Sequence, residues 1–307
     1  GQVTRMTWWC MRMRHKIWLC HWSGSVSDCG LVGDIVWVPD RTQLSIDPKF
    51  FSVDYPGAWT EHKEDSANVM SAGGGDQKVV VSCNSTWSVV TNGVRWIEAL
   101  NLPMEGRVFS NVDRPYDRLP SNVTTNVNGG VRNMKCHTAG EQVRFVTNSK
   151  KLSFKWKSVN RNLAMDHMPS TGVSGIDVYR FDAEKGRWLY VKTGRIWDAK
   201  KGGSQSVDWT PGTPCIVNLP LYNGIKSFRL GIDPTAKIEA LGPRKSGVDK
   251  PVVFYGTSIT HGGCCSRPGL GFVNLVGRHL DVPVVGLGFS GSGVMEFEMS
   301  EHLVRID

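Results

Sequence analysis

The hydrophobic pattern of this chain changes its period near residue 250, and this change limits the possible folds more than any other feature. Between about residues 94 and 240, apolar and polar residues alternate in short segments, which is typical of strands with one wet face. After residue 250 come continuous apolar runs and a helical repeat, which are typical of a parallel sheet with helical crossovers. The sequence therefore predicts two kinds of β structure, one after the other.

The alternating region predicts an antiparallel β-sandwich, jelly-roll-like, over residues 94–240. Its expected strands are 143–145, 152–156, 176–181, 188–191 and 228–232, and turn residues separate them. In one such turn, Asn223-Gly224 predicts a tight hairpin, because both positions tolerate a positive φ.

The region after the polar linker 241–250 reads strand, helix, strand, helix. Strands are expected at 251–255 and 282–287, and a second helix at 295–306. The first helix has an apolar repeat at i, i+3, i+4, i+7 and i+8, formed by Phe272, Leu275, Val276, His279 and Leu280. This predicts the first βαβα portion of an α/β parallel-sheet domain at 251–307. Two strands are too few to close a core, so we expect the domain to be unfinished.

Residues 1–93 show neither pattern, and we predict an unassigned extension there, poorly ordered or outside the folded domains. An apolar fraction of 40% and a charged fraction of 21% are typical of a soluble globular protein. No apolar run is long enough to predict a membrane span, and no signal peptide is visible. Eight cysteines without any C-x-x-C spacing do not predict a zinc site.

The formal charge of +8 is unevenly distributed. Residues 131–165 contain eight Lys or Arg but Glu141 as their only acidic residue. One interpretation is an anionic partner, such as an acidic polysaccharide or nucleic acid. The other is the wet face of strands, since the lysines in 152–157 alternate with large apolar residues.

Ser258 is the candidate nucleophile. The apolar run 252–255 ends at Gly256, and Ser258 follows two positions later, at the carboxyl edge of the expected parallel sheet. The second expected strand ends in the glycine-rich loop 288–293 at the same edge. Parallel neighbours place the two loops side by side, so the backbone N–H groups of Ser258 and Gly291 would face one oxyanion.

These blocks resemble a known family. Gly256-Thr257-Ser258-Ile259-Thr260 resembles the first block of SGNH (GDSL-type) hydrolases, with threonine where the family has aspartate, and 288–291 resembles the second block. Upstream, 174–179 resembles the Gly-x-Asp-Leu-Tyr motif of the β-rich domain that precedes the hydrolase in one subgroup. Segments 115–120, 168–172 and 219–224 fit the same subgroup. The resemblance covers residues 94–307.

The resemblance implies a serine esterase that acts on O-esters through an acyl-Ser258 intermediate, with Gly291 as a second backbone oxyanion donor. It implies acyl or acetyl esters, with carbohydrate as the favoured alcohol, a periplasmic or secreted location, and no metal or organic cofactor. A nucleic-acid partner is not favoured, because only the charge of the chain suggests one. The family's oxyanion asparagine and base histidine lie in later blocks, and neither block follows Gly293 here. We therefore expect this chain alone to be incomplete and nearly inactive.

Resident histidines are weak substitutes for the missing base. His261 would have to reach back over its own turn to Ser258, and His279 is expected to pack in the core. His302 is expected to be solvated, whereas His137 and His167 lie in the β-rich region. The alternative function is a non-catalytic glycan- or protein-binding β-sandwich module with a remnant hydrolase tail.

Overall fold

The computed structural model describes residues 7–13, 16–22, 51–54, 59–64, 67–72, 80–83, 88–123 and 126–306. The chain divides into two compact units, Gly1–Gly93 and Val94–Asp307. Among the described residues, no helix has the length and apolar character needed to cross a membrane.

The first unit contains strands in its described segments, where the sequence predicted no element. A sheet has the order β2-β1-β5-β4, and β3 pairs with β6. The β1–β2 and β4–β5 pairs are antiparallel, whereas β1 and β5 run parallel. The bounds are β1 Thr7–Met13, β2 Lys16–Trp22, β3 Phe51–Asp54, β4 Trp59–Glu64, β5 Ala67–Ala72, β6 Val80–Cys83 and β7 Ser88–Thr91.

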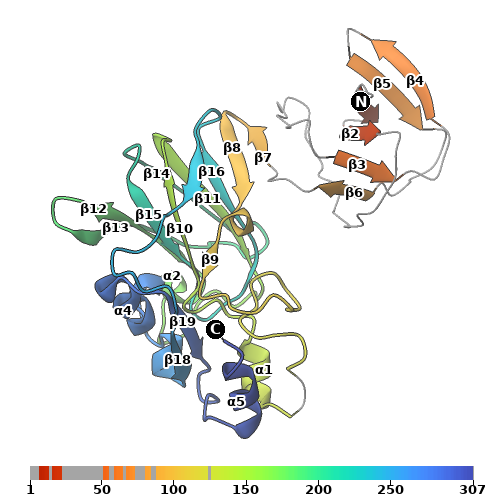
Figure 1. Cartoon of the computed structure of the whole chain (residues 1–307). Helices are drawn as coiled ribbons and strands as arrows, with labels where there is room; N and C mark the ends of the chain where they lie inside the picture. The colour runs from red at the N-terminus through yellow and green to blue at the C-terminus, as the bar shows by residue number, and fades with distance from the viewer. Residues whose placement is uncertain are drawn as a thin grey trace. The chain divides into compact units, whose positions relative to one another are not determined.

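The second unit contains two antiparallel sheets (Figure 1). One has the order β13-β12-β15-β10-β17, with β9 also paired to β10, and the other contains β14-β11-β16-β8. The bounds are β8 Val94–Glu98, β9 Met104–Glu105, β10 Gln142–Thr147, β11 Lys151–Ser158, β12 Ile176–Asp182, β13 Arg187–Gly194, β14 Gly203–Asp208, β15 Pro214–Asn218, β16 Ile225–Ile232 and β17 Ile238–Ala240. The predicted antiparallel sheets are confirmed, and the jelly-roll-like sandwich stays a prediction.

Both sheets contribute to one hydrophobic core. On β11, Leu152, Phe154 and Trp156 are buried, whereas Lys155 between them is exposed, as the alternation predicted. Their cluster includes Phe145 of β10 in the other sheet. Burying side chains of this size contributes roughly 1.5–3 kcal/mol each.

Beyond the sheets, β18 and β19 form the predicted parallel pair, with Gly256 opposite Gly288. Figure 1 shows them together with α1, α4 and α5 at one end of the unit, below the two antiparallel sheets. The bounds are β18 Val252–Gly256, α3 Ser258–His261, η2 Pro268–Leu270, α4 Phe272–Leu280, β19 Val284–Gly288 and α5 Phe297–Leu303. Two further helices, α1 Gly129–Met134 and α2 Ser170–Val173, come from the β-rich region, where η1 spans Ala99–Asn101.

Among the described residues, α4 does not bury His279 and Leu280, which the sequence predicted on its buried face. Leu280 is 56% exposed and His279 is also exposed, whereas Val273, Asn274 and Gly277 are buried. A Cβ at Gly277 would lie only 3.0 Å from a methyl group of Val284, so the glycine lets the helix lie close to β19. Within the described residues, close backbone approach at Gly277 sets the face that α4 packs on β19, while Leu275 and Leu280 of the apolar repeat face outward.

The hairpin predicted at Asn223-Gly224 is also wrong. These residues connect β15 and β16, which lie in different sheets, and neither has a positive φ. The Asn223 side chain is buried, where it accepts a hydrogen bond from Asn160 N–H (2.9 Å) and donates to Ser174 Oγ (3.0 Å). Its amide thus holds together loops of the β-rich region.

Candidate active site

Ser258 begins α3 two residues after β18 ends, so the strand delivers its hydroxyl to the edge of the parallel pair. The turn is tight, since a Cβ at Gly256 would lie 2.5 Å from Thr260 Oγ1. The Ser258 carbonyl accepts hydrogen bonds from Gly263 N–H (2.7 Å) and from the hydroxyl of Tyr222 (3.4 Å). Gly262, with φ of 89°, ends α3 in the left-handed conformation that closes such helices.

The loop after β19 runs directly against this turn. Phe289 N–H donates to Gly256 O at 2.8 Å. A Cβ at Gly288 would lie inside 3.0 Å of the His261 and Thr260 backbone, a separation that real Cβ atoms essentially never show. Gly291 is exposed at the tip of this loop, with φ of 67°. The structure thus places the loops of Ser258 and Gly291 side by side, as the parallel strands predicted.

His261 connects these two loops to the β-rich region. Its ring is buried, Nδ1 accepts a hydrogen bond from Ser290 N–H at 3.2 Å, and Nε2 lies 3.2 Å from Nδ1 of His137. Because Ser290 N–H occupies Nδ1, the His261 proton is on Nε2 and is donated to His137. The proton on His137 Nε2 then faces the Asn160 side-chain amide, whose nitrogen lies 3.4 Å away. Two donors cannot pair, so the amide is expected in the flipped orientation, with its oxygen toward His137.

Both histidines are held in the neutral form. Burial, followed by the nearby Arg118, lowers the pKa of His137 to about 3 and that of His261 well below 6.5. The Tyr222 ring stacks on His261, with ring centroids 4.0 Å apart and planes 13° apart. Since both ring nitrogens of His261 are engaged, this histidine orients the loop of Ser290 and is not placed to accept the Ser258 proton.

Arg118 supports the same loop from the other side. Its buried guanidinium donates to the carbonyls of Gly286 (2.8 Å), Gly288 (2.9 Å) and Met134 (3.0 Å). It also lies over the Phe289 ring, 4.6 Å from the centroid. Arg118 therefore fixes the end of β19 from which the glycine-rich loop departs.

Asp177 supports the loop that precedes α4. Its buried carboxylate accepts hydrogen bonds from Gly269 N–H and from the Asn218 side chain, both at 2.8 Å, and Arg267 lies 3.6 Å away. Burial raises its pKa to about 6 despite these partners. A Cβ at Gly269 would meet the ring of Tyr179 at 2.5 Å. The aspartate and tyrosine of the Gly-x-Asp-Leu-Tyr-like segment thus clamp the segment that follows α3.

Among the described residues, no hydrogen bond joins His167, His279 or His302 to this group. His167 is exposed in the turn between Met165 and Met168. His302, expected to be solvated, is buried, which corrects that prediction, and burial lowers its pKa. In the described residues, no three His, Cys, Asp or Glu side chains gather as metal ligands would.

Comparison with known proteins gives two family matches and several structural ones. Residues 94–238 match the GxDLY model, the N-terminus of the esterase SGNH hydro-type family, and residues 249–307 match the GDSL-like lipase/acylhydrolase family. A search of curated proteins found no match.

Two solved structures are similar to this chain. One is described as a GDSL-like lipase from Bacteroides ovatus ATCC 8483, with a TM-score of 0.60 and 25% identity over 70% of this chain. The other is the salicylyl-acyltransferase SsfX3 of a tetracycline biosynthetic pathway, with a TM-score of 0.50 and 20% identity over 66% of this chain, a likeness of fold alone. The chain spans 62% and 56% of the lengths of these two structures.

Proposed function

Because the chain belongs, over residues 94–307, to the SGNH (GDSL-type) hydrolases that carry an N-terminal GxDLY domain, we propose that Ser258 is the nucleophile of acyl-ester hydrolysis. The observation that carries the proposal is the contact between the Ser258 turn and the 288–293 loop. This contact supports the proposal because it brings the turn that bears the half-buried Ser258 against the loop that bears the exposed Gly291, and a hydroxyl nucleophile with backbone oxyanion donors is what acyl transfer needs besides its base.

In the proposed reaction, Ser258 Oγ gives its proton to the general base and attacks the acyl carbon. The carbonyl oxygen becomes an oxyanion, which accepts hydrogen bonds from the N–H groups of Ser258 and Gly291. The intermediate then collapses, the protonated base gives its proton to the departing alcohol, and acyl-Ser258 remains. Water gives a proton to the base and attacks the acyl carbon, and the proton returns to Ser258 Oγ as the acid leaves. Ser258 N–H belongs to the first residue of α3 and has no acceptor within the helix. Gly291 N–H has no backbone acceptor among the described residues.

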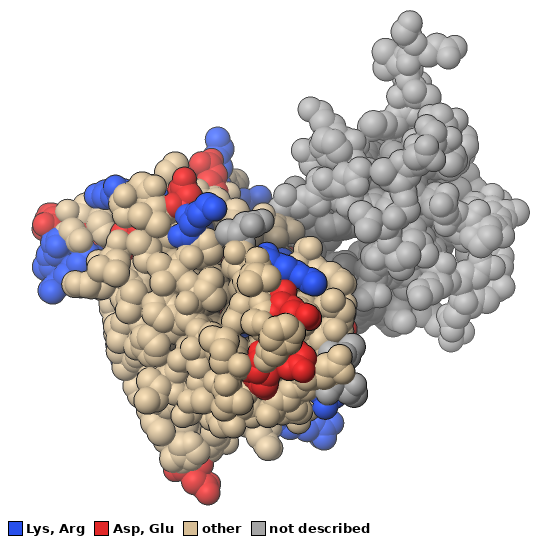
Figure 2. Space-filling view, turned by 60° about the horizontal axis from the view of Figure 1, so that its bottom comes forward, with Lys and Arg blue, Asp and Glu red and all other residues tan. Residues whose placement is uncertain are grey.

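We propose that the general base and a third oxyanion donor come from outside the described residues. The support is that both nitrogens of His261 are engaged, and that large apolar side chains around the parallel strands are exposed. These are Val252, Val253, Leu275, Leu280 and Phe297. Figure 2 turns this end forward and shows charged side chains mostly at the margins of a broad uncharged area. A serine without its base retains only the effects of binding and the oxyanion donors.

The proposed substrates are acyl or acetyl O-esters, with carbohydrate as the preferred alcohol. The support for an ester is the match to lipases and acylhydrolases, and the support for a sugar is a hollow lined by lysine, arginine and serine residues on the sheet that contains β14, β11 and β16.

The test is p-nitrophenyl acetate hydrolysis by the 307-residue chain and its Ser258→Ala variant. We expect equal, near-background rates. The second part of the test is to read the coding sequence past Asp307. If it continues into a strand with an asparagine, and later an Asp-x-x-His, we expect the longer protein to be an active esterase. Its Ser258→Ala variant should then lose at least about 10³-fold in kcat. Fast turnover by the 307-residue chain would contradict the proposal that its base lies outside the described residues. Full activity of the longer Ser258→Ala variant would contradict the proposal that Ser258 is the nucleophile.

A further inference from the structure

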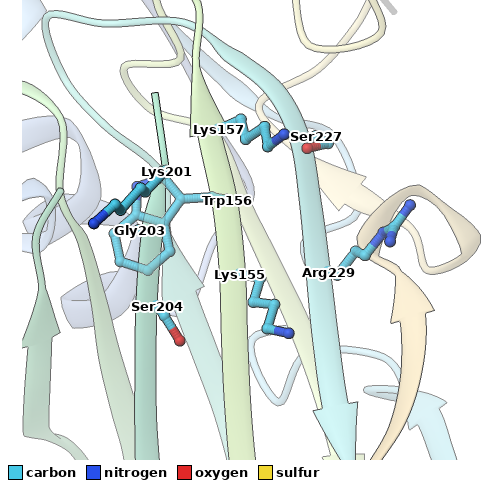
Figure 3. Close-up of a pocket in the computed structure, with 9 residues that line it drawn as sticks. Lys155, Trp156, Lys157, Lys201, Gly203, Ser204, Ser227 and Arg229 are labelled. Carbon is cyan, nitrogen blue, oxygen red and sulfur yellow. The ribbon is translucent and has the colours of Figure 1, made fainter. Parts of the chain in front are cut away.

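The outer face of the second sheet contains a hollow of about 430 Å³ that is separate from the Ser258 loops. It lies over β14, β11 and β16, and Figure 3 shows the side chains around it. Basic and small polar residues dominate its lining, which includes Lys155, Lys157, Lys201, Ser204, Ser227 and Arg229. No acidic residue is in that lining.

The hollow exists because small residues occupy the outward positions between the basic ones. In the strand register, Ser204 lies opposite Lys155, and Ser227 lies opposite Lys157. In the next row, Ser153 pairs with Ser206 through their hydroxyls at 2.9 Å and lies opposite Gly231. Strand positions of this kind usually have β-branched or aromatic residues, which would fill the space.

A sharp turn adds the fourth cation. Gly202 has φ of 81°, and a Cβ there would lie 2.5 Å from the Trp156 carbonyl oxygen. This glycine lets the turn lie directly against β11, which places Lys201 in the lining of the hollow, beside the Trp156 ring in Figure 3. The basic groups therefore come from three separate chain segments.

The charges are arranged unfavourably for the isolated fold. Lys155 and Arg229 lie directly opposite each other on neighbouring antiparallel strands, and like charges in such pairs are destabilising. Glu98 pairs with Arg229 at 2.5 Å, and the Lys155 ammonium lies 4.3 Å from the centroid of the Trp96 ring, so the repulsion is only partly offset. An anion bound in the hollow would neutralise the remaining repulsion between Lys155 and Arg229. Unfavourable like-charge pairs of this kind are expected at functional sites.

We infer that this hollow binds an acidic polysaccharide through carboxylate or sulfate groups on neighbouring sugars. Four cations supply charge, and the serine hydroxyls between them donate to and accept from sugar hydroxyls. The volume falls within the range of small-ligand sites, so it holds one short segment of the chain.

A glycan fits better than a nucleic acid. Single-stranded nucleic acid is bound by aromatic side chains that stack on bases. In this hollow, the Trp156 ring is buried in the core, and the Trp96 ring faces Lys155. Duplex DNA needs at least about 600 Å² of protein surface, more than one short hollow provides.

The test is calorimetric titration of the 307-residue chain with polygalacturonate and, separately, with dextran sulfate, so that carboxylate and sulfate recognition are distinguished. Neutral dextran and a thymidine oligonucleotide are the comparison ligands. The double variant Lys155→Gln/Lys157→Gln is expected to weaken binding by at least about tenfold. The matched control Arg187→Gln/Lys192→Gln removes the same charge from exposed positions on β13 in the other sheet, and is expected to weaken binding by less than about twofold.

Binding to either acidic polymer that falls with added salt and is lost selectively in the β11 variant supports the site. The site is refuted by equal losses in the two variants, by dextran binding of the same affinity, by tighter binding to the oligonucleotide, or by no binding to either acidic polymer. Ser258→Ala is expected to bind like the unmodified chain, so this result is independent of the proposed esterase activity.

Discussion

Gly288→Ala tests the packing of the Ser258 turn on the loop after β19. The added methyl carbon would lie inside 3.0 Å of the His261 and Thr260 backbone atoms. These are main-chain atoms, so no side-chain rotation relieves the overlap. The added Cβ would lie 2.0 Å from His261 N, so the α3 turn and β19 would have to separate by about 1.4 Å to reach the 3.4 Å of ordinary contact. Overpacking of this kind costs about 1–3 kcal/mol.

The expected effect on stability follows from the size of the second unit. For domains of 150–250 residues, about 1 kcal/mol corresponds to roughly 2–4 °C in Tm, so we expect Gly288→Ala to lower Tm by about 2–12 °C. The separation would also weaken the hydrogen bond from Ser290 N–H to His261 Nδ1. Exchange of the Ser290 amide with solvent should therefore become faster.

The measurements are thermal unfolding and amide exchange, with Gly129→Ala as the matched control. Gly129 begins α1 without a positive φ, and the nearest atom to an added Cβ is the flexible Arg132 side chain at 3.7 Å. This variant should unfold within about 2 °C of the unmodified chain. If Gly288→Ala also unfolds there and leaves Ser290 exchange unchanged, the close packing described for the two loops is incorrect.

Three further predictions concern buried polar groups. Glu141 is buried, neither of its carboxyl oxygens has a partner among the described residues, and burial raises its pKa from 4.5 to about 8. The folded state keeps this proton between those pH values while the unfolded state releases it, so stability should fall by up to about 5 kcal/mol as pH rises through that window. In urea titrations, the free energy of unfolding should fall less steeply with pH in Glu141→Gln than in the unmodified chain. Equal slopes for the two proteins would contradict this prediction. His261→Phe keeps a ring against Tyr222 but leaves Ser290 N–H without its acceptor, which should cost about 1–3 kcal/mol in urea unfolding, and a change below about 0.5 kcal/mol would refute the role. Asp177→Ala removes the acceptor of Gly269 N–H and should speed exchange of that amide by at least about tenfold, whereas unchanged protection would show that the clamp is not needed.

Local patterns predicted the elements of this chain well. The alternating segments became β10 to β13 and β16, and the apolar runs became β18 and β19, because the side-chain period reports which face of an element is buried. The adjacency of the Ser258 and Gly291 loops was also predictable, since it follows from strand direction alone.

Contacts between distant segments were not predictable in the same way. His137 and His261 are separated by 124 positions, and no helical or strand repeat in the sequence indicates that they are in contact. The buried face of α4 depended on Gly277, whose missing side chain leaves no apolar signal in the sequence. The sequence predicts a turn at Asn223, because asparagine next to glycine is typical of turns. The same two residues give no sign that the Asn223 amide is buried and holds loops together.

The hydrogen bonds of Arg118, His137 and Asp177 have a consequence for recombination between relatives. The linker at 241–250 separates two sequence modules, yet each of these three side chains from the first module binds a backbone or ring atom of the second. A chimaera joined at the linker would leave buried donors and acceptors unmatched unless the three positions and their partners came from the same parent. A crossover point that preserves folding would therefore lie before Arg118, upstream of the linker that the sequence suggests as the natural place to cut.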